Sequence, residues 1–256
     1  MVRGIHTAAS GMTAQQAMLD TLANNLANAD TIGYKQDLST FRSLRDLALR
    51  RYERGDRGHG APVGALSTGA SFDSAAPDLA PGTLTRTGEP LDAAIVGDGL
   101  FCVQTPNGER YTRAGHFELT PAPAKAGAAP AAFLTDTQGN RLLGARGAID
   151  VGAARTVTIE PSGAVVADGR TLDTLRVVKA PASALRHEGS NLLASSALVT
   201  PALPTLRPGY VERSNVGVVG SMVRMITVQR AYEAAQRTVT AQDETLGKLV
   251  NEAGRF

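Results

Sequence analysis

The sequence has little cysteine, little aromatic bulk and no long apolar run. Its single cysteine, Cys102, excludes an intramolecular disulfide, so the fold does not depend on oxidation. Tryptophan is absent and aromatic residues make up only 4% of the chain, which favours a thin or elongated shape over a thick enzyme core. No stretch approaches the roughly 18 consecutive apolar residues that span a bilayer, so direct membrane insertion is not expected.

Signals for secretion and for nucleic-acid binding are also missing. The first residues lack the apolar core of roughly 7–15 residues that marks a secretory signal peptide. The formal net charge is only +2, and no aromatic residues are interleaved with the basic ones, so no nucleic-acid partner is expected. If this chain is exported, the export route must recognise a signal other than a secretory signal peptide.

Motifs for catalysis are absent too. His6, His59, His116 and His187 share no metal-ligand spacing, and the chain contains no nucleophile elbow, zinc-protease motif or phosphate loop. Cys102 lies in an apolar stretch without a nearby histidine, which indicates a small core residue. The acidic residues are scattered around turns, which gives no reason to expect a glycosidase pair. We therefore expect no enzyme, no cofactor and no metal site.

What the sequence does contain is a seven-residue apolar spacing at its N-terminal end. One stripe consists of Ile5, Met12, Leu19 and Leu26, and a second of Ala8, Leu22 and Ala29, interrupted by Gln15. This pattern predicts a helix of coiled-coil type over residues 4–29, about 40 Å long. Residues 30–33 end it.

The C-terminal end repeats this spacing. One stripe consists of Val218, Met225, Tyr232, Val239 and Leu246; the predicted partner stripe consists of Met222, Gln229, Gln236, Asp243 and Val250. An additional apolar row contains Val219, Val223 and Ile226. The pattern predicts a helix over residues 216–251, capped by Ser214–Asn215 and stopped at Gly254.

The two helices have two interpretations. They could form an ordinary hairpin packed on the chain's own domain. Alternatively, they pair like a coiled coil, and their remaining faces pack on neighbouring copies. The small residues along both helices and the Gln and Asp in the seams favour the assembly pair.

The middle of the chain divides into a connector and a β domain. Residues 42–60 alternate in charge sign, which favours a solvated helix or linker over a polyanion-binding patch. Residues 61–80 are rich in Gly, Ala, Ser and Pro and indicate an irregular connector. Short strand patterns then follow, with turn signals at Asn107-Gly108 and at residues 138–140 and a low-complexity insertion at 121–132.

These observations predict an α+β fold in which long N- and C-terminal helices pair and an all-β domain is inserted between them. The expected segments are a helix with its exit loop (1–36), a connector (37–80), a β domain (81–210) and a C-terminal assembly helix (211–256).

Three segments resemble a known family. "GIHTAASGMTAQQAMLDTLANNLANADTIGYKQ" (4–36) and "PGYVERSNVGVVGSMVRMITVQRAYEAAQRTVTAQDETLGKLVNE" (208–252) are similar to the terminal signatures of the bacterial flagellar rod, hook and hook-associated axial proteins. "TGEPLDAAIVGDGLFCVQTPNGERYTRAGHFEL" (87–119) resembles the β-domain entry of the rod and hook members. The chain departs from the family at the 121–132 insertion and at Gly217 and Gly220.

The length and the single β domain favour a rod protein over a hook or hook–filament junction protein, which is the alternative. The ending "DETLGKLVNEAGRF" favours the proximal over the distal rod type. A third alternative is an enzyme or binding module acting on cell-wall glycan.

The resemblance implies a structural subunit of the basal-body rod. It implies a helical tube with the terminal helices inside, which lines the export channel and transmits torque from motor to hook. The implied partners are copies of the chain, other rod and hook subunits and the flagellar type III export apparatus. The implied location is the rod in the periplasmic part of the cell envelope, reached without a cleaved signal peptide.

The expected assembly residues follow from the seams and the resemblance. The seam is Ile5, Met12, Leu19, Leu22, Leu26, Val218, Met222, Met225, Tyr232, Val239 and Leu246. Asn24, Asn25 and Asn28 are expected to fix register through amide hydrogen bonds between subunits; alternatively, they only weaken and cap the helix end before Gly33. Both ends are expected to be largely disordered in the monomer, and residues 42–60 to brace neighbouring subunits.

Overall fold

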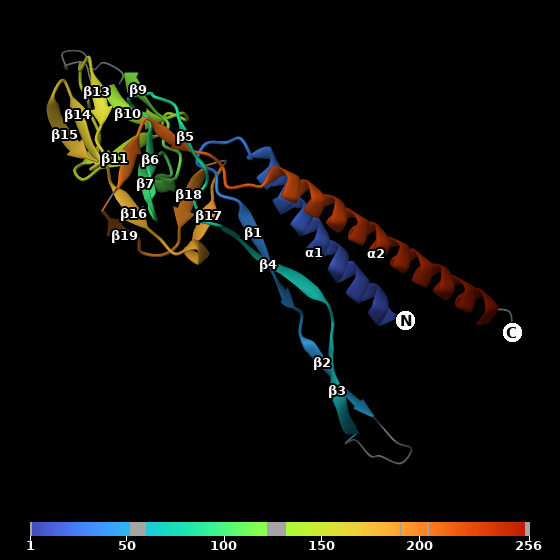
Figure 1. Ribbon diagram of the computed structural model, residues 1–256. Helices are drawn as coiled ribbons and strands as arrows, with labels where there is room; N and C mark the ends of the chain where they lie inside the picture. The colour runs from blue at the N-terminus through green and yellow to red at the C-terminus, as the bar shows by residue number, and fades with distance from the viewer. Residues whose placement is uncertain (1, 52–59, 122–131, 190, 204, 254–256) are drawn as a thin grey trace. The chain divides into compact units, whose positions relative to one another are not determined.

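The computed structural model forms two compact units. It describes residues 2–51, 60–121, 132–189, 191–203 and 205–253 (Figure 1). The first unit comprises Met1–Asn24, Ser39–Ala75 and Val218–Phe256. The second comprises Asn25–Leu38 and Ala76–Gly217.

Two long helices belong to the first unit. Helix α1 (Val2–Ala27) and helix α2 (Val218–Ala253) lie side by side and antiparallel (Figure 1). A Cβ atom built on Gly4 would lie 2.9 Å from Nε2 of Gln242, so the start of α1 faces the end of α2. Both predicted helices and the α+β class are confirmed, whereas coiled-coil packing between the helices remains a prediction.

The least exposed face of α2 differs in part from the predicted seam. It consists of Ser221, Met225, Val228, Tyr232, Ala235, Val239, Gln242 and Leu246, at alternating intervals of four and three. Every second one belongs to the predicted main stripe, but the predicted partner stripe is exposed. The physical reason is that Val228 and Ala235 can be covered at little cost, whereas Gln236 and Asp243 keep their water.

The connector predicted between the first helix and the β domain is instead a two-stranded ribbon. Strand β1 (Asp37–Ser43) pairs with β4 (Ala70–Pro77), and β2 (Asp46–Arg51) pairs antiparallel with β3 (Ala61–Ser67). The prediction of a solvated helix or irregular connector is therefore wrong for these residues, while residues 52–59 lie outside the described part. Short-range charge alternation indicated solvent exposure correctly, but a two-stranded ribbon exposes its side chains equally well.

Helix α1 supports the first part of this ribbon. The hydroxyl of Ser39 donates to Oγ1 of Thr21 at 2.8 Å. A Cβ built on Gly69 would lie 2.0 Å from Oγ of Ser10, so the ribbon backbone comes close to the helix only because residue 69 is glycine. These contacts with α1 thus stabilise strands that the local sequence does not predict.

The second unit is an all-β domain, as predicted. Its strands are β5 (Leu84–Arg86), β6 (Ala93–Ile95), β7 (Leu100–Thr105), β8 (Gly108–Thr112), β9 (Phe117–Pro121), β10 (Ala132–Asp136), β11 (Arg141–Gly144), β12 (Gly147–Ala148), β13 (Val157–Ile159), β14 (Ala164–Ala167), β15 (Arg170–Thr174), β16 (Val177–Lys179), β17 (Leu185–His187), β18 (Leu192–Ser195), β19 (Thr200–Ala202), β20 (Leu206–Pro208) and β21 (Tyr210–Glu212), with a short 3-10 helix at Ala182–Ala184. In its largest sheet, neighbouring strands pair in the order β17-β18-β8-β7-β11-β10-β9.

The predicted hairpins in this sheet are present. Strands β7 and β8 pair in the register Thr105↔Gly108, and Gly108 has a φ of 107°. Strands β10 and β11 are joined through Gly139, whose φ is 81°. The core lies against both faces of β7: Phe101 packs edge-on against Phe117 on one face, and Cys102 lies in a second apolar cluster on the other. Residues 122–131 of the predicted insertion lie outside the described residues.

Candidate assembly surface

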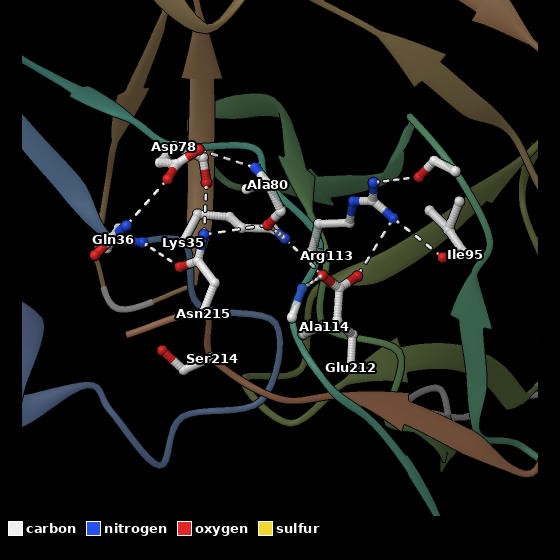
Figure 2. Close-up of polar contacts among 12 residues, drawn as sticks. Lys35, Gln36, Asp78, Ala80, Ile95, Arg113, Ala114, Glu212, Ser214 and Asn215 are labelled. Atoms are coloured by element: carbon white, nitrogen blue, oxygen red, sulfur yellow. Dashed lines mark hydrogen bonds and ion pairs between the residues drawn. The ribbon is translucent and has the colours of Figure 1, made fainter. Parts of the chain in front are cut away.

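A buried charged cluster of the second unit, which we call the polar hub, joins the exit loop of α1 to strand β21 (Figure 2). It consists of Lys35, Arg113 and Glu212, whose side chains are almost fully buried. Oε1 of Glu212 lies 2.5 Å from Nζ of Lys35, and Oε2 lies 3.3 Å from Nη1 of Arg113. The carboxylate therefore sits between two cations.

Backbone groups complete the polar hub. The amide of Gly82 donates to Oε1 of Glu212 at 2.7 Å, and Nζ of Lys35 donates to the carbonyl of Ala80 at 2.7 Å. Arg113 donates to the carbonyls of Ile95 and Gly97. Burial lowers the pKa of Lys35 and of Arg113, and the carboxylate of Glu212 opposes both effects.

A sharp turn delivers Lys35 to the polar hub. Gly33 has a φ of 70°, and its amide donates to the carbonyl of Glu212 at 2.8 Å. A Cβ on Gly33 would lie 2.1 Å from the amide nitrogen of Ala114, so no other residue fits here. The next side chain, Tyr34, stacks on His187 with ring centroids 5.0 Å apart.

Asn25 makes several hydrogen bonds within the chain. Its side chain is buried; Oδ1 accepts from the hydroxyl of Tyr34 at 2.9 Å and from the amide of Asp37 at 2.8 Å. Nδ2 donates to the carbonyl of Asp37 at 2.9 Å. Both acceptor positions of its amide oxygen are thus occupied by the exit loop, and a register role between subunits remains a prediction for this asparagine.

The other two asparagines differ from Asn25 in their surroundings. Oδ1 of Asn28 accepts from the hydroxyl of Thr31 at 3.2 Å, a local contact that fits the alternative of an end cap. Asn24 is exposed on α1. A register role for these two residues likewise remains a prediction.

The predicted N-cap of α2 is also corrected. Helix α2 starts at Val218, and the side chain of Asn215 instead bridges three backbone segments. Its Oδ1 accepts from the amide of Gln36 at 2.8 Å, and its Nδ2 donates to the carbonyls of Asp78 and Ala80 (Figure 2). Asp78 in turn accepts from Ala80 N and from Gln36 Nε2, which hold the pKa of its carboxyl below its usual value.

No local sequence pattern predicts the polar hub. Lys35 and Glu212 are 177 residues apart and lie at the inner edges of the two terminal segments, where a charged residue ordinarily indicates solvent. Glu212 lies in β21 next to the buried Val211 and is itself buried. Its burial follows from the exit loop, which covers it.

The predicted seam residues fall into two groups. Leu22 is buried, and a larger set is partly buried: Ile5, Met12, Leu19, Leu26, Met225, Tyr232, Val239 and Leu246. Val218 and Met222 are exposed. Leu22 and the eight partly buried residues are thus less exposed than Val218 and Met222, and a role of the whole set as an assembly seam remains a prediction.

Further apolar side chains of the first unit are exposed on the ribbon. Phe41 and Phe72 pack edge to face at 6.0 Å, and Leu47 lies opposite Leu66 across β2 and β3, yet all four are exposed. Two-stranded ribbons are marginal in water without a covering layer. The ribbon and the outer face of α2 are accordingly the candidate assembly surfaces.

Chemistry beyond packing finds little support among the described residues. No group of three or more metal-ligating side chains is present in that part of the chain. Cys102 is buried, and desolvation raises the pKa of its thiol to about 12, the opposite of what a nucleophile needs. No helix in the described ranges is long and apolar enough to cross a membrane.

Three family models match separate parts of the chain. Residues 5–35 match "Flagella basal body rod protein", residues 94–167 match "Flagellar hook protein FlgE/F/G D1 domain" and residues 207–252 match "Flagellar basal body rod FlgEFG protein C-terminal". The two terminal matches contain most of α1 and most of α2, and the middle one covers the centre of the β domain.

Relatives of known name match over nearly their whole length. The flagellar basal-body rod protein FlgG of Bacillus subtilis is 31% identical over 98% of this chain and 99% of its own. FlgG of Caulobacter vibrioides is 31% identical over 96% and 97% of the two chains. The rod protein FlgF of Escherichia coli is 32% identical over 94% of this chain and 93% of its own, so identity does not separate FlgG from FlgF.

Proposed function

The chain belongs to the flagellar basal-body rod proteins, and from this premise we propose that it polymerises into a helical tube that transmits torque from motor to hook and lines the export channel. It is a structural protein of the rod rather than an enzyme. Its proposed partners are further copies, other rod and hook subunits and the flagellar type III export apparatus. The proposed location is the rod where it crosses the periplasmic space.

The observation that carries this proposal is the uncovered apolar face of α2. Val219, Val223 and Ile226 are 75%, 58% and 53% exposed in the first turns of α2. Three neighbouring aliphatic side chains on one helix face favour a partner surface, since burying each would contribute roughly 1.5–3 kcal/mol. A tube built from helix pairs supplies that surface through contacts between unlike faces, which need not close into a ring.

We also propose that the helices reach their final order only on assembly. In the monomer, only one narrow stripe of α2 is covered, and Gly217 and Gly220 weaken the start of the helix. An incompletely folded chain would suit passage through a narrow export channel without a cleaved signal peptide. Far-UV circular dichroism of the dilute monomer should show much less helix than the two described helices require; full helicity would argue against this step.

A hook or hook–filament junction role is the alternative. The D1 family model is that of a flagellar hook protein domain, so the match to the β domain does not by itself separate the two roles. The full-length matches to proteins named as rod subunits favour the rod.

The test is to remove the gene in the source bacterium and restore it with a tagged full-length chain. In the deletion strain we expect rods that stop short, and we expect the tagged chain to restore complete rods. Tag signal should be found in basal bodies stripped of hooks. Tag signal in the hook or at the hook–filament junction, with a complete rod in the deletion strain, would reject the rod role in favour of the alternative.

A further inference from the structure

Helix α2 carries an outer stripe that its own α1 cannot cover. The outer stripe consists of Val219, Val223, Ile226 and Arg230, all of them exposed. At about 100° per residue, these side chains point away from the covered face that contains Val228 and Tyr232. They are therefore available to a partner molecule.

Helix α1 presents an open groove beside α2. The groove has a volume of about 490 Å³ and is lined by Ala9, Met12, Thr13, Gln16, Ala17 and Asp20, with Tyr232 at one side. Its floor is low because the side chains at positions 9, 13 and 17 are small. Asp20 is the one charged lining residue, and Nε2 of Gln16 donates to it at 3.1 Å.

The groove and the outer stripe match in spacing. Ala9, Thr13, Gln16 and Asp20 follow one another at intervals of four, three and four residues, and so do the four residues of the outer stripe. Both sets therefore span about 16 Å of helix.

The two surfaces also match in charge. Between residues 218 and 232, α2 contains Arg224 and Arg230 and no acidic residue, and between residues 4 and 27 the only acidic or basic residue besides His6 is Asp20. The opposite charges occupy the same, C-terminal end of each set. Charge complementarity thus selects a parallel alignment and disfavours the reverse one.

We propose that the outer stripe of one copy docks in the α1 groove of a second copy. In this register Val219 lies on Ala9, Val223 on Thr13 and Ile226 on Gln16. Arg230 pairs with Asp20 at the end of the groove. The aliphatic side chains supply the affinity and the ion pair sets the register. The inference rests on the proposed function and names the surfaces through which successive copies meet.

A pair of introduced cysteines tests the register in the full-length chain. Thr13→Cys with Val223→Cys, combined in one chain and oxidised in isolated basal bodies, should give disulfide-linked multimers of this chain on a non-reducing gel. Cys102 is buried and provides little background. The matched control, Thr13→Cys with the exposed Val250→Cys, should remain unlinked.

Charge reversal tests the direction. Asp20→Arg or Arg230→Asp in the cysteine-bearing chain should abolish most of the linked species, and the two together should restore it. Both side chains are exposed, so neither change should unfold the monomer. Cross-links to a different rod protein only, or unchanged yields in the single reversals, would overturn the inference.

The outcomes separate the inference from the proposed function. If the variants enter basal bodies and support motility but give no linked species, the docking register is wrong while the rod role stands. If the wild-type chain is absent from basal bodies, the proposed function and this inference both fail.

Discussion

Lys35, Arg113 and Glu212 place two positive charges and one negative charge out of contact with water. Burying ions costs several kcal/mol each, and their mutual attraction offsets this only when the remaining donors and acceptors are also satisfied. Backbone groups of residues 80–82 and 95–97 meet only part of that condition, since Nε of Arg113 and Oε2 of Glu212 make no hydrogen bond within the described part of the chain. The polar hub therefore does more to specify where the exit loop lies than to add net stability.

The polar hub should respond unequally to removal of its members. Glu212→Gln leaves two buried cations without a carboxylate and should lower the free energy of unfolding by about 3–5 kcal/mol. Lys35→Met removes a cation, leaves Glu212 paired with Arg113 and the Gly82 amide, and should cost clearly less. Urea denaturation of both variants measures the difference; an equal or larger loss for Lys35→Met would contradict this account.

Asp78 should make the second unit sensitive to acid. Its pKa is lowered in the folded chain by hydrogen bonds from Ala80 and Gln36, so its contribution to stability is complete above the ordinary carboxyl value and is lost as the pH falls through the folded value. The stability gap between wild type and Asp78→Asn should thus be largest near neutral pH and shrink below about pH 4. Urea melts across that range give the gap, and a constant gap would contradict the prediction.

At the scale of single elements, neighbours decide where each helix and strand ends. Helix α1 ends because Asn25 binds the exit loop and Gly33 turns it, not because its apolar pattern stops at a fixed residue. Helix α2, in contrast, receives no side-chain cap from Asn215, because that side chain hydrogen-bonds to the backbone of the second unit. Its first turn is correspondingly weak.

Two glycines should respond in opposite ways to alanine. Gly220→Ala lies in a helix with open space around its Cβ position, so it should stabilise α2 by up to about 1 kcal/mol. Gly33→Ala would force a Cβ onto the backbone of Ala114 at a positive φ and should destabilise by more than that. Circular dichroism and thermal unfolding of the two variants report the signs. A destabilising Gly220→Ala would show that the small residue is needed for packing in the monomer.

For the whole molecule, the question is why an exposed ribbon interrupts the helix pair in sequence. Strands β2 and β3 carry apolar side chains, and β2 also carries arginines, that are exposed in the described part of the chain. We expect these residues to brace neighbouring subunits, as the arginine-rich segment 42–60 suggested, although residues 52–59 lie outside the described part.

Shortening the ribbon tests this role. Leu44 N donates to Gly69 O at 2.8 Å, so residues 45–68 can be replaced by Asn-Gly, which closes a tight hairpin at that point. The shortened chain should be exported normally and give a looser or shorter rod in electron micrographs. The control, Leu47→Ser with Leu66→Ser, retains the ribbon but loses its apolar pair and should have a milder effect. A rod of normal length and stiffness in the shortened strain would dismiss the bracing role.

The sequence by itself determined the elements whose signal is local and periodic. The seven-residue spacing of Met225, Tyr232 and Val239 sets one covered edge of α2, and Asn107-Gly108 sets a hairpin, because each depends only on residues close in sequence. Only the tertiary structure decided the partners: Val228 in place of Gln229, a ribbon in place of a connector, and Lys35 buried against Glu212. Burial and hydrogen bonding between separate segments, 177 residues apart for Lys35 and Glu212, depend on which surfaces meet, and no local pattern encodes that.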